Sequence, residues 1–218
     1  MDVRKVNYYE ACDQAISSLN RMMVEDFGRL KTVKFDRVNV IQTVVALYRE
    51  NVKKARKRYY EVAFEAYLLM LALCDIEPKE AHRMAEKAID QEWVKDVLEQ
   101  TDFVTLYRFD AEAERKAYRL AEALEVATDR SAEIDRAMKA WSIQIGQYAI
   151  NVTDYAMIQA LQDAGVPMAR WVDMHDGRVC TDCRQLDGRV FPVDEIPAKP
   201  HMRCRCRLEP VFEAEDDD

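Results

Sequence analysis

The stretch "DRVNVIQTVVALYRENVKKARKRYYEVAFEAYLLMLALC", from Asp36 to Cys74, contains neither glycine nor proline and carries apolar residues at intervals of three and four. That spacing places them on one face of an α-helix. If it is unbroken, which the sequence leaves open, such a helix is about 55 Å long at 1.5 Å per residue, and this exceeds the usual length in globular domains. The stretch therefore predicts an elongated helical body or an element that spans a partner.

Helical patterns also flank this stretch. On its N-terminal side, residues 7–30 place apolar side chains on one face, and on its C-terminal side Pro78 starts a third helix that should run to about Gln100. The β-branched and aromatic residues of Thr101–Asp110 predict a short extended connector. Asp110 can then cap a fourth helix.

Breaker residues mark the end of the helical part. Ser131 either restarts or continues the fourth helix, Gly165 is the expected C-terminal cap, and Pro167 supports the stop. The chain has five glycines and six prolines, and most of these residues lie at or beyond Gly165. The chain therefore changes there from helices to turns and short strands.

Composition argues against a non-specific DNA-binding protein, a secreted protein and a membrane-spanning protein. The formal net charge of −8 argues against tight, non-specific DNA binding by the whole surface. The first residues lack the apolar core of a secretory signal, and no apolar run approaches the roughly 18 residues of a membrane span. We therefore expect a reducing cytosol, where clustered cysteines more often bind metal than form disulfides. The isolated Cys12 and Cys74 are expected to be small core residues.

Four of the six cysteines lie near the C-terminus, in the pattern C-x2-C-x17-H-x2-C-x-C. This spacing is typical of a zinc ribbon, because a C-x2-C turn brings two thiolates to one side and leaves backbone N–H groups free to donate to sulfur. We predict one structural Zn²⁺ per chain. Its ligands are four of five candidates: Cys180, Cys183, His201, Cys204 and Cys206. The H-x2-C spacing, which mirrors the C-x2-C spacing of the first pair, favours His201 together with Cys204. Cys206 could replace either, so the fourth ligand stays open.

A small β-ribbon is expected around these ligands. Asp187-Gly188, between "RQL" and "RVF", predicts a two-residue hairpin with a type I′ turn. The alternating "RCRCRL" predicts a strand with one face of Cys204, Cys206 and Leu208 and another of Arg203, Arg205 and Arg207.

The predicted fold is therefore mainly α, an elongated bundle of long helices followed by a small zinc-ribbon-like β-hairpin module. The expected divisions are a helical domain over 1–165, a zinc-binding β module over 166–212 and an acidic disordered tail over 213–218. A catalytic metal is the less favoured alternative. His175 and Asp176 could serve it, but soft ligands normally close the coordination sphere, and neither H-E-x-x-H nor the deaminase signature occurs.

The C-terminal stretch "RWVDMHDGRVCTDCRQLDGRVFPVDEIPAKPHMRCRCRLEP" resembles the signature of phage head-morphogenesis, or minor capsid, proteins of the Mu F-like family. The matching residues are Trp171, Asp176, Arg178, Val179, Cys180, Cys183, Leu186, Gly188, Pro197, Pro200, His201, Cys204, Arg205 and Cys206. One departure is Met202, where many relatives have proline.

The resemblance implies a non-enzymatic structural role in the virion. Such proteins enter the prohead, inside the head at the portal vertex, after synthesis in the host cytoplasm. They contact the portal protein and other head proteins and assist head assembly, DNA packaging or delivery. We expect an oligomeric state within that assembly and no membrane contact.

Two rival functions follow from the residues. The first is a zinc-stabilised nucleic-acid-binding module, in which Arg203, Arg205 and Arg207 meet the phosphates of packaged DNA. The second is a metal-dependent hydrolase that uses His175 and Asp176.

Overall fold

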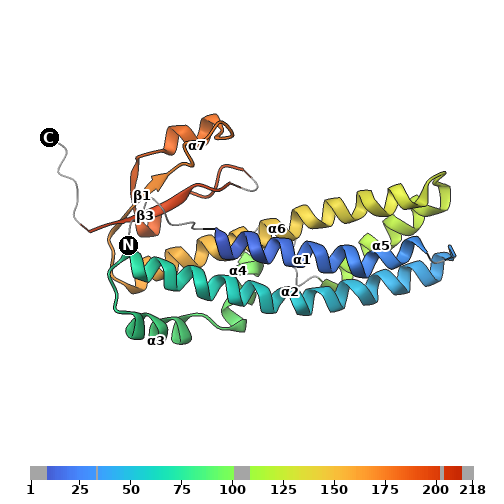
Figure 1. The fold of residues 1–218 in the computed structure, drawn as a ribbon, viewed down its shortest axis with the longest axis horizontal. Coiled ribbons are helices and arrows are strands. Elements are labelled where there is room, and N and C mark those ends of the chain that lie inside the picture. The colour runs from blue at the N-terminus through green and yellow to red at the C-terminus, as the bar shows by residue number, and fades with distance from the viewer. Residues whose placement is uncertain (1–8, 33, 101–108, 202–203, 213–218) are drawn as a thin grey trace.

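The computed structural model describes residues 9–32, 34–100, 109–201 and 204–212. Long helices form a bundle, and a small sheet with one short helix stands beside it near one end (Figure 1). This arrangement confirms the predicted mainly α fold with a small C-terminal β module. Among the described helices, none is both long enough and apolar enough to cross a membrane.

The longest element is α2 (Arg37–Leu73), a single unbroken helix; the sequence predicts the helix but leaves its continuity open. It begins where the Asp36 side chain accepts a hydrogen bond from the backbone N–H of Asn39, at 2.7 Å. It ends before Asp75, which has a positive φ of 57°. Because nothing between these points interrupts the backbone hydrogen bonds, α2 can serve as the spine of the bundle.

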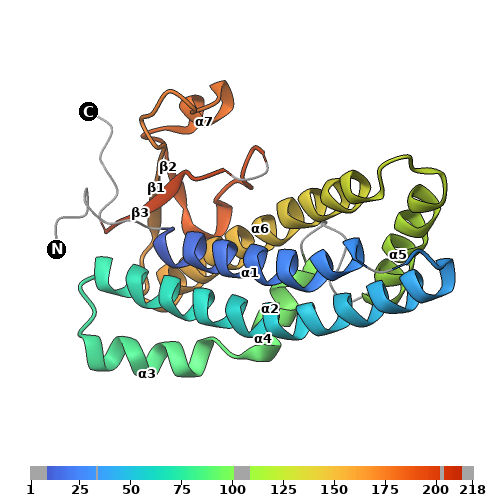
Figure 2. The same ribbon diagram turned by 45° about the vertical axis from the view of Figure 1, so that its right-hand side comes forward.

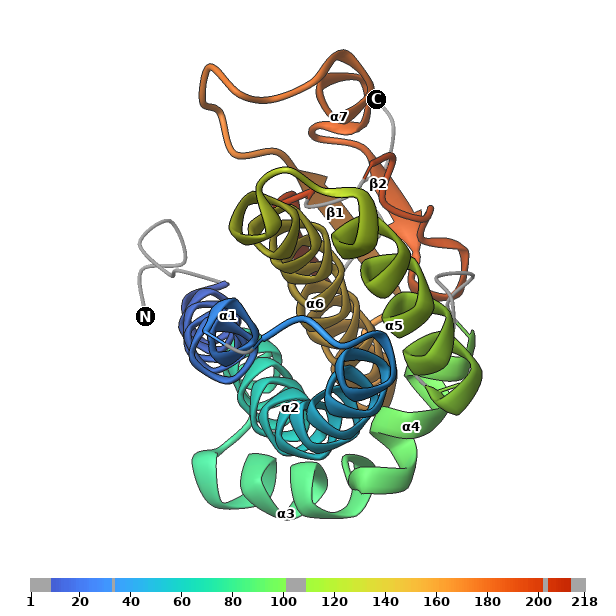
Figure 3. The same cartoon turned by 90° about the vertical axis from the view of Figure 1, so that its right-hand side faces the viewer.

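Three further long helices pack against α2: α1 (Glu10–Gly28), α5 (Phe109–Val126) and α6 (Arg130–Asp163). A short 3-10 turn, η2 (Arg29–Lys31), follows α1. These helices lie side by side (Figure 2) and, seen along the bundle axis, enclose a common interior (Figure 3). Large side chains fill that interior; Phe27, Tyr59 and Tyr148 are almost fully buried. Cys12 and Cys74 are buried among them, which confirms the prediction that they are core residues.

Two helix boundaries differ from the prediction. The single helix expected from Pro78 to Gln100 is two helices, α3 (Pro78–Ala88) and α4 (Gln91–Gln100). The chain is extended at Ile89, and Asp90 accepts a hydrogen bond from the backbone N–H of Trp93, so the second helix has a cap of its own.

The fourth predicted helix also differs at its ends. Helix α5 begins at Phe109, so Asp110 lies inside it and does not cap it. A separate helix, α6, restarts at Arg130 with Asp129 as its cap, one residue ahead of the expected Ser131. The expected connector falls on residues 101–108, which lie outside the described residues, as does the tail over 213–218.

The end of α6 sets the position of the C-terminal module. Gly165 has a positive φ of 68°, and the N–H of Val166 bonds to the carbonyl of Leu161. This geometry ends the helix as predicted. Strand β1 (Met168–Val172) follows and lies at the centre of an antiparallel sheet, between β2 (Val190–Pro192) and β3 (Arg207–Val211).

The predicted hairpin at Asp187-Gly188 is wrong. A turn does occur there, but it joins the short helix α7 (Thr181–Leu186) to β2, and β2 pairs with β1. Asp187 has a negative φ of −57° and only Gly188 a positive one, which is the pattern of a type II turn. The reason is that the segment before the turn forms a helix, so no strand is available to pair across it.

The predicted alternation of "RCRCRL" is partly confirmed. Cys204, Cys206 and Leu208 are all buried, whereas Arg205 and Arg207 are half-buried; Arg203 lies outside the described residues. The strand itself starts only at Arg207. A second 3-10 turn, η3 (Val193–Glu195), follows β2.

The buried apolar core is continuous between the helices and the module. Trp171, Ala169 and Leu208 of the sheet belong to the same cluster as Tyr67 and Leu161 of the bundle. The sheet therefore rests on the helices through apolar contacts. The division into separate domains at residue 165 stays a prediction.

Candidate metal centre

The first ligand pair is built at the start of α7. Cys180 precedes the helix in an extended conformation, and its Sγ accepts a hydrogen bond from the backbone N–H of Cys183, at 3.3 Å. This hydrogen bond lowers the pKa of the Cys180 thiol. The C-x2-C segment thus directs both sulfurs to one side and donates an N–H to sulfur, as its spacing predicts.

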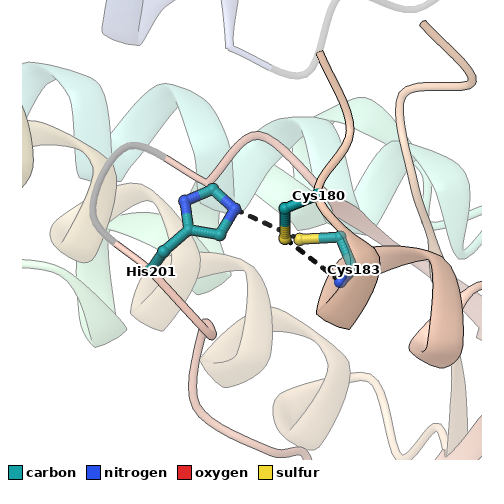
Figure 4. A group of neighbouring side chains, drawn as sticks. All are labelled: Cys180, Cys183 and His201. Atoms are coloured by element: carbon teal, nitrogen blue, oxygen red, sulfur yellow. Dashed lines mark hydrogen bonds between the residues drawn. The ribbon is translucent and has the colours of Figure 1, made fainter. Parts of the chain in front are cut away.

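Cys183 lies at the centre of the candidate site. Its Sγ is 3.3 Å from His201 Nε2 and 3.5 Å from Cys204 Sγ. In Figure 4 the His201 ring faces the two sulfurs of Cys180 and Cys183 from the opposite side. Two sulfurs bound at 2.3 Å to a tetrahedral Zn²⁺ are about 3.8 Å apart. The observed separations from Cys183 are close to this value, so Cys183 is placed to share a metal ion with either of these two neighbours.

The five candidates form two overlapping groups. Cys180, Cys183 and His201 have ligand atoms within 4.8 Å of one another, and so do Cys183, Cys204 and Cys206. Cys183 belongs to both groups. The structure therefore brings together all five residues that the sequence selected, around this one sulfur.

Protonation differs among the buried sulfurs. A hydrogen bond from the Cys206 thiol lowers the pKa of Cys204 to about 5. The same contact raises the pKa of Cys206, because its proton is held between the two sulfurs. Burial raises the pKa of Cys183 to about 12. Cys204 therefore offers a thiolate at neutral pH, whereas Cys183 must lose a proton when it binds a metal ion.

A polar anchor network, consisting of Tyr9, Asp154 and Lys199, joins this site to the helices. The Tyr9 hydroxyl donates to Asp154 Oδ1 at 2.7 Å and lies 2.9 Å from the carbonyl oxygen of Cys206. Lys199 Nζ donates to the Tyr9 hydroxyl at 2.8 Å and also contacts the Cys206 carbonyl. Lys199 lies 3.3 Å from Asp154 Oδ1. Burial raises the pKa of Asp154, and the positive charge of Lys199 opposes that shift.

Sequence reasoning missed the anchor network. Its residues come from the start of the described chain, from α6 and from the loop before His201, and 145 positions separate Tyr9 from Asp154. No local motif links such distant residues, so only the packing of the sheet on the bundle reveals them.

His175 and Asp176, the residues of the less favoured catalytic alternative, have different contact partners in the structure. His175 Nδ1 lies 3.1 Å from Asp173 Oδ1 and 3.8 Å from Asp187 Oδ2. Asp176 instead accepts from Arg205 at 2.8 Å. Asp173, His175 and Asp187 form a third group of ligand-type atoms. Within it, His175 contacts both carboxylates, which accounts for the conformation of this loop. His175 and Asp176 thus serve different contacts.

The arginines that were candidates for phosphate binding also have partners. Arg205 bonds to Asp176, and Arg207 bonds to Glu209 at 3.0 Å. A phosphate group would have to compete with these carboxylates for the guanidinium groups.

Comparison with known proteins gives one match. Residues 90–209, more than half of the chain, match the family model described as Phage Mu protein F like protein. The matched region runs from the cap of α4 through α5 and α6 to β3, and it includes every candidate metal ligand. No curated protein and no solved structure matches the chain.

Proposed function

The chain belongs to the family of phage Mu protein F like proteins, and from this membership we propose that it is a minor head protein of a phage. In this role it is a structural protein of the virion, inside the head, and assists head assembly, DNA packaging or delivery. The observation that carries the proposal is the family match, which spans both the helices α4–α6 and the whole cysteine-containing module.

The proposed role is non-enzymatic. A catalytic metal keeps an open coordination position with a general base nearby. Here soft sulfur and imidazole ligands surround Cys183, which favours a closed structural site. His175, the candidate base, is engaged with Asp173 and Asp187.

We further propose that the module binds one structural Zn²⁺ through four of the five candidate ligands. The short separations around Cys183, to His201 and to Cys204, support a set made of Cys180, Cys183, His201 and Cys204. In that set Cys206 is left as a thiol that donates to the Cys204 sulfur. Such a donor would stabilise the thiolate and tune its affinity for the metal.

The expected partners are the portal protein and other head proteins. The long helices α2 and α6 provide extended surfaces for such contacts. Binding at the portal vertex, an oligomeric state within the assembly and contact with packaged DNA through Arg203, Arg205 and Arg207 remain predictions. Of these arginines, the two that the structure describes are already paired with carboxylates, which favours protein contacts over DNA contacts.

The head role can be tested in the parental phage. We expect the chain to be present in purified heads by mass spectrometry, and a tagged copy to retain the portal protein of the same phage through purification. A tagged variant that lacks the module serves as the comparison. If the chain is absent from heads that are otherwise complete, the proposed role is wrong.

The metal can be tested on the purified protein by elemental mass spectrometry. We expect about one zinc per chain, lost with Cys180→Ser and retained with Cys206→Ser if the proposed ligand set is correct. Loss of the metal with Cys206→Ser and not with Cys204→Ser would exchange these two residues in the ligand set. Absence of metal together with paired thiols would contradict both the zinc site and the reducing environment.

A further inference from the structure

A basic groove lies between α5 and α6, at the end of the bundle away from the sheet. It has a volume of about 350 Å³, and its lining among the described residues consists of four cationic side chains, one carboxylate and several apolar side chains. The cations are Arg115, Lys116, Arg119 and Arg136, and the carboxylate is Glu133. Between these charged rims, the groove has an apolar floor that includes Leu120 and Trp141.

This groove stands out because the protein as a whole carries a net charge of −8. Neighbouring carboxylates are already neutralised: Glu122 and Glu125 of α5 pair with Arg37. Glu133 pairs with Arg136. Within the described residues Arg119 is exposed and has no ion-pair partner. The groove therefore retains net positive charge, and it suits an occupant that combines carboxylates with an apolar side chain.

The chain itself contains such a segment. Its last seven residues read "FEAEDDD", one aromatic residue followed by five carboxylates within six positions. Phe212 directly follows β3, and 56% of its surface is exposed. An acidic segment with one apolar residue matches the charged rims and the apolar floor of the groove.

This segment is too short to reach the groove of its own chain. Val211 pairs with Met168, just beyond the C-terminal end of α6, and β3 runs away from the α5–α6 connection (Figures 1 and 2). Between Ala140, which lines the groove, and Asp163, at the end of α6, the helix rises by about 35 Å. Seven fully extended residues span at most about 25 Å. The occupant must therefore come from another molecule.

We propose that the acidic segment 212–218 of one copy binds the α5–α6 groove of a second copy. The contact joins different surfaces of the two copies, so association is head-to-tail and produces a ring or an open chain of copies. This inference goes beyond the proposed head role and does not depend on it, because it concerns the purified protein alone.

The experiment measures association by sedimentation velocity with three full-length variants. The groove variant is Arg115→Glu/Arg119→Glu. The tail variant replaces the five carboxylates of residues 213–218 by amides. The matched control is Lys53→Glu/Lys57→Glu, which reverses two exposed charges at the same spacing on α2.

The wild type and the control are expected to associate in a concentration-dependent manner, more weakly when salt rises from about 50 mM to about 300 mM. The groove variant and the tail variant should each associate at least about tenfold more weakly. When the two variants are mixed, one has an intact segment and the other an intact groove. The mixture should therefore form a 1:1 dimer and nothing larger, which only a head-to-tail contact produces.

Three results would overturn the proposal. The first is a wild-type protein that stays monomeric at low salt. The second is a groove variant that associates as strongly as the Lys53→Glu/Lys57→Glu control. The third is a tail variant that associates like the wild type while its groove binds a labelled DNA duplex, which would assign the groove to nucleic acid.

Discussion

The helical body and the C-terminal module are held together by different means. In the body, almost every fully buried large side chain is apolar or aromatic, and these side chains meet across four long helices. In the module, three of the buried residues are cysteines of the candidate metal site, and the sheet has only three short strands. The body can therefore fold by apolar burial, whereas the module, if it binds the proposed zinc, is stabilised by the metal ion in addition to its contacts with the body.

This difference explains why the two regions carry different sequence signals. A long helix requires only the absence of breakers and a repeated apolar face, and both extend over dozens of residues in α2. A small module requires a few specific side chains at specific positions. Variants that separate these two modes of stabilisation are the strongest tests of the comparison.

The largest effect is expected for Cys183→Ser. Cys183 belongs to both groups of candidate ligands, so its loss should reduce the metal content from about one ion per chain to almost none. The module should then unfold locally while the helices persist, because the bundle core does not need the metal. Elemental mass spectrometry, limited proteolysis and far-UV circular dichroism measure these three properties.

Cys74→Ser is the matched control, since Cys74 is a buried cysteine of the body, outside both ligand groups. It should keep its metal and a protected module. Loss of the helical signal in Cys183→Ser, to the same extent as the loss of the module, would show that the two regions depend on the metal equally and would break the comparison.

The next effect concerns the body alone. Phe27 is 1% exposed and packs edge-to-face on Trp141, with ring centroids 4.8 Å apart. We expect Phe27→Ala to lower the free energy of unfolding by about 3 to 5 kcal/mol, with the metal still bound. Val24 lies on the same helix but is 52% exposed, so Val24→Ala should cost less than about 0.5 kcal/mol. Chemical denaturation of both variants gives the comparison, and equal losses would contradict it.

The metal affinity should depend on pH. Burial holds the pKa of Cys183 at about 12, so this thiol must release a proton on binding. The metal-bound state therefore holds fewer protons, and affinity should rise by at least about tenfold per pH unit through neutral pH.

Below pH 5 the dependence should steepen, because the Cys204 thiolate, with a pKa of about 5, also takes up a proton. Competition with a chelator between about pH 6 and 8 measures the slope. A flat profile over this range would mean that the ligands are already deprotonated before the metal binds.

The helical body and the C-terminal module also differ in how much of their structure the sequence predicts. The helical state of the α2 stretch, the stop at Gly165 and the burial of Cys12 and Cys74 were all predictable, since each depends on local residues, whereas the continuity of α2 was left open. The break between α3 and α4 was not predictable, because an aspartate at position 90 is equally compatible with an exposed site inside a helix and with the cap of a new helix. The prediction of a hairpin at Asp187-Gly188 was wrong because a turn sequence does not determine whether strands or a helix flank the turn.

The grouping of the five candidate residues was predictable, but the contacts around them were not. Spacing alone selected the five residues that gather around Cys183. Pairing of Asp176 with Arg205, and of His175 with Asp173, depends on how the loop closes over the module. These contacts join residues far apart in the chain or within an irregular loop, where no periodic pattern exists to reveal them.

The smallest effect should come from the anchor network, which is the polar link between the two regions. Tyr9→Phe removes the hydroxyl that reaches Asp154 and the carbonyl of Cys206. Because the Cys206 carbonyl is buried, Asp154 is partly buried and each loses a partner, we expect a cost of about 1 to 3 kcal/mol. The loss should weaken the contact between the module and the helices and leave the stability of the bundle unchanged. Hydrogen exchange should therefore increase in β1 and β3 but not in α2. The control is Tyr155→Phe, which changes a 40% exposed tyrosine on the same helix as Asp154. Uniformly increased exchange over both regions would instead assign Tyr9 to the stability of the whole fold, and the module would then be a part of the body's cooperative unit.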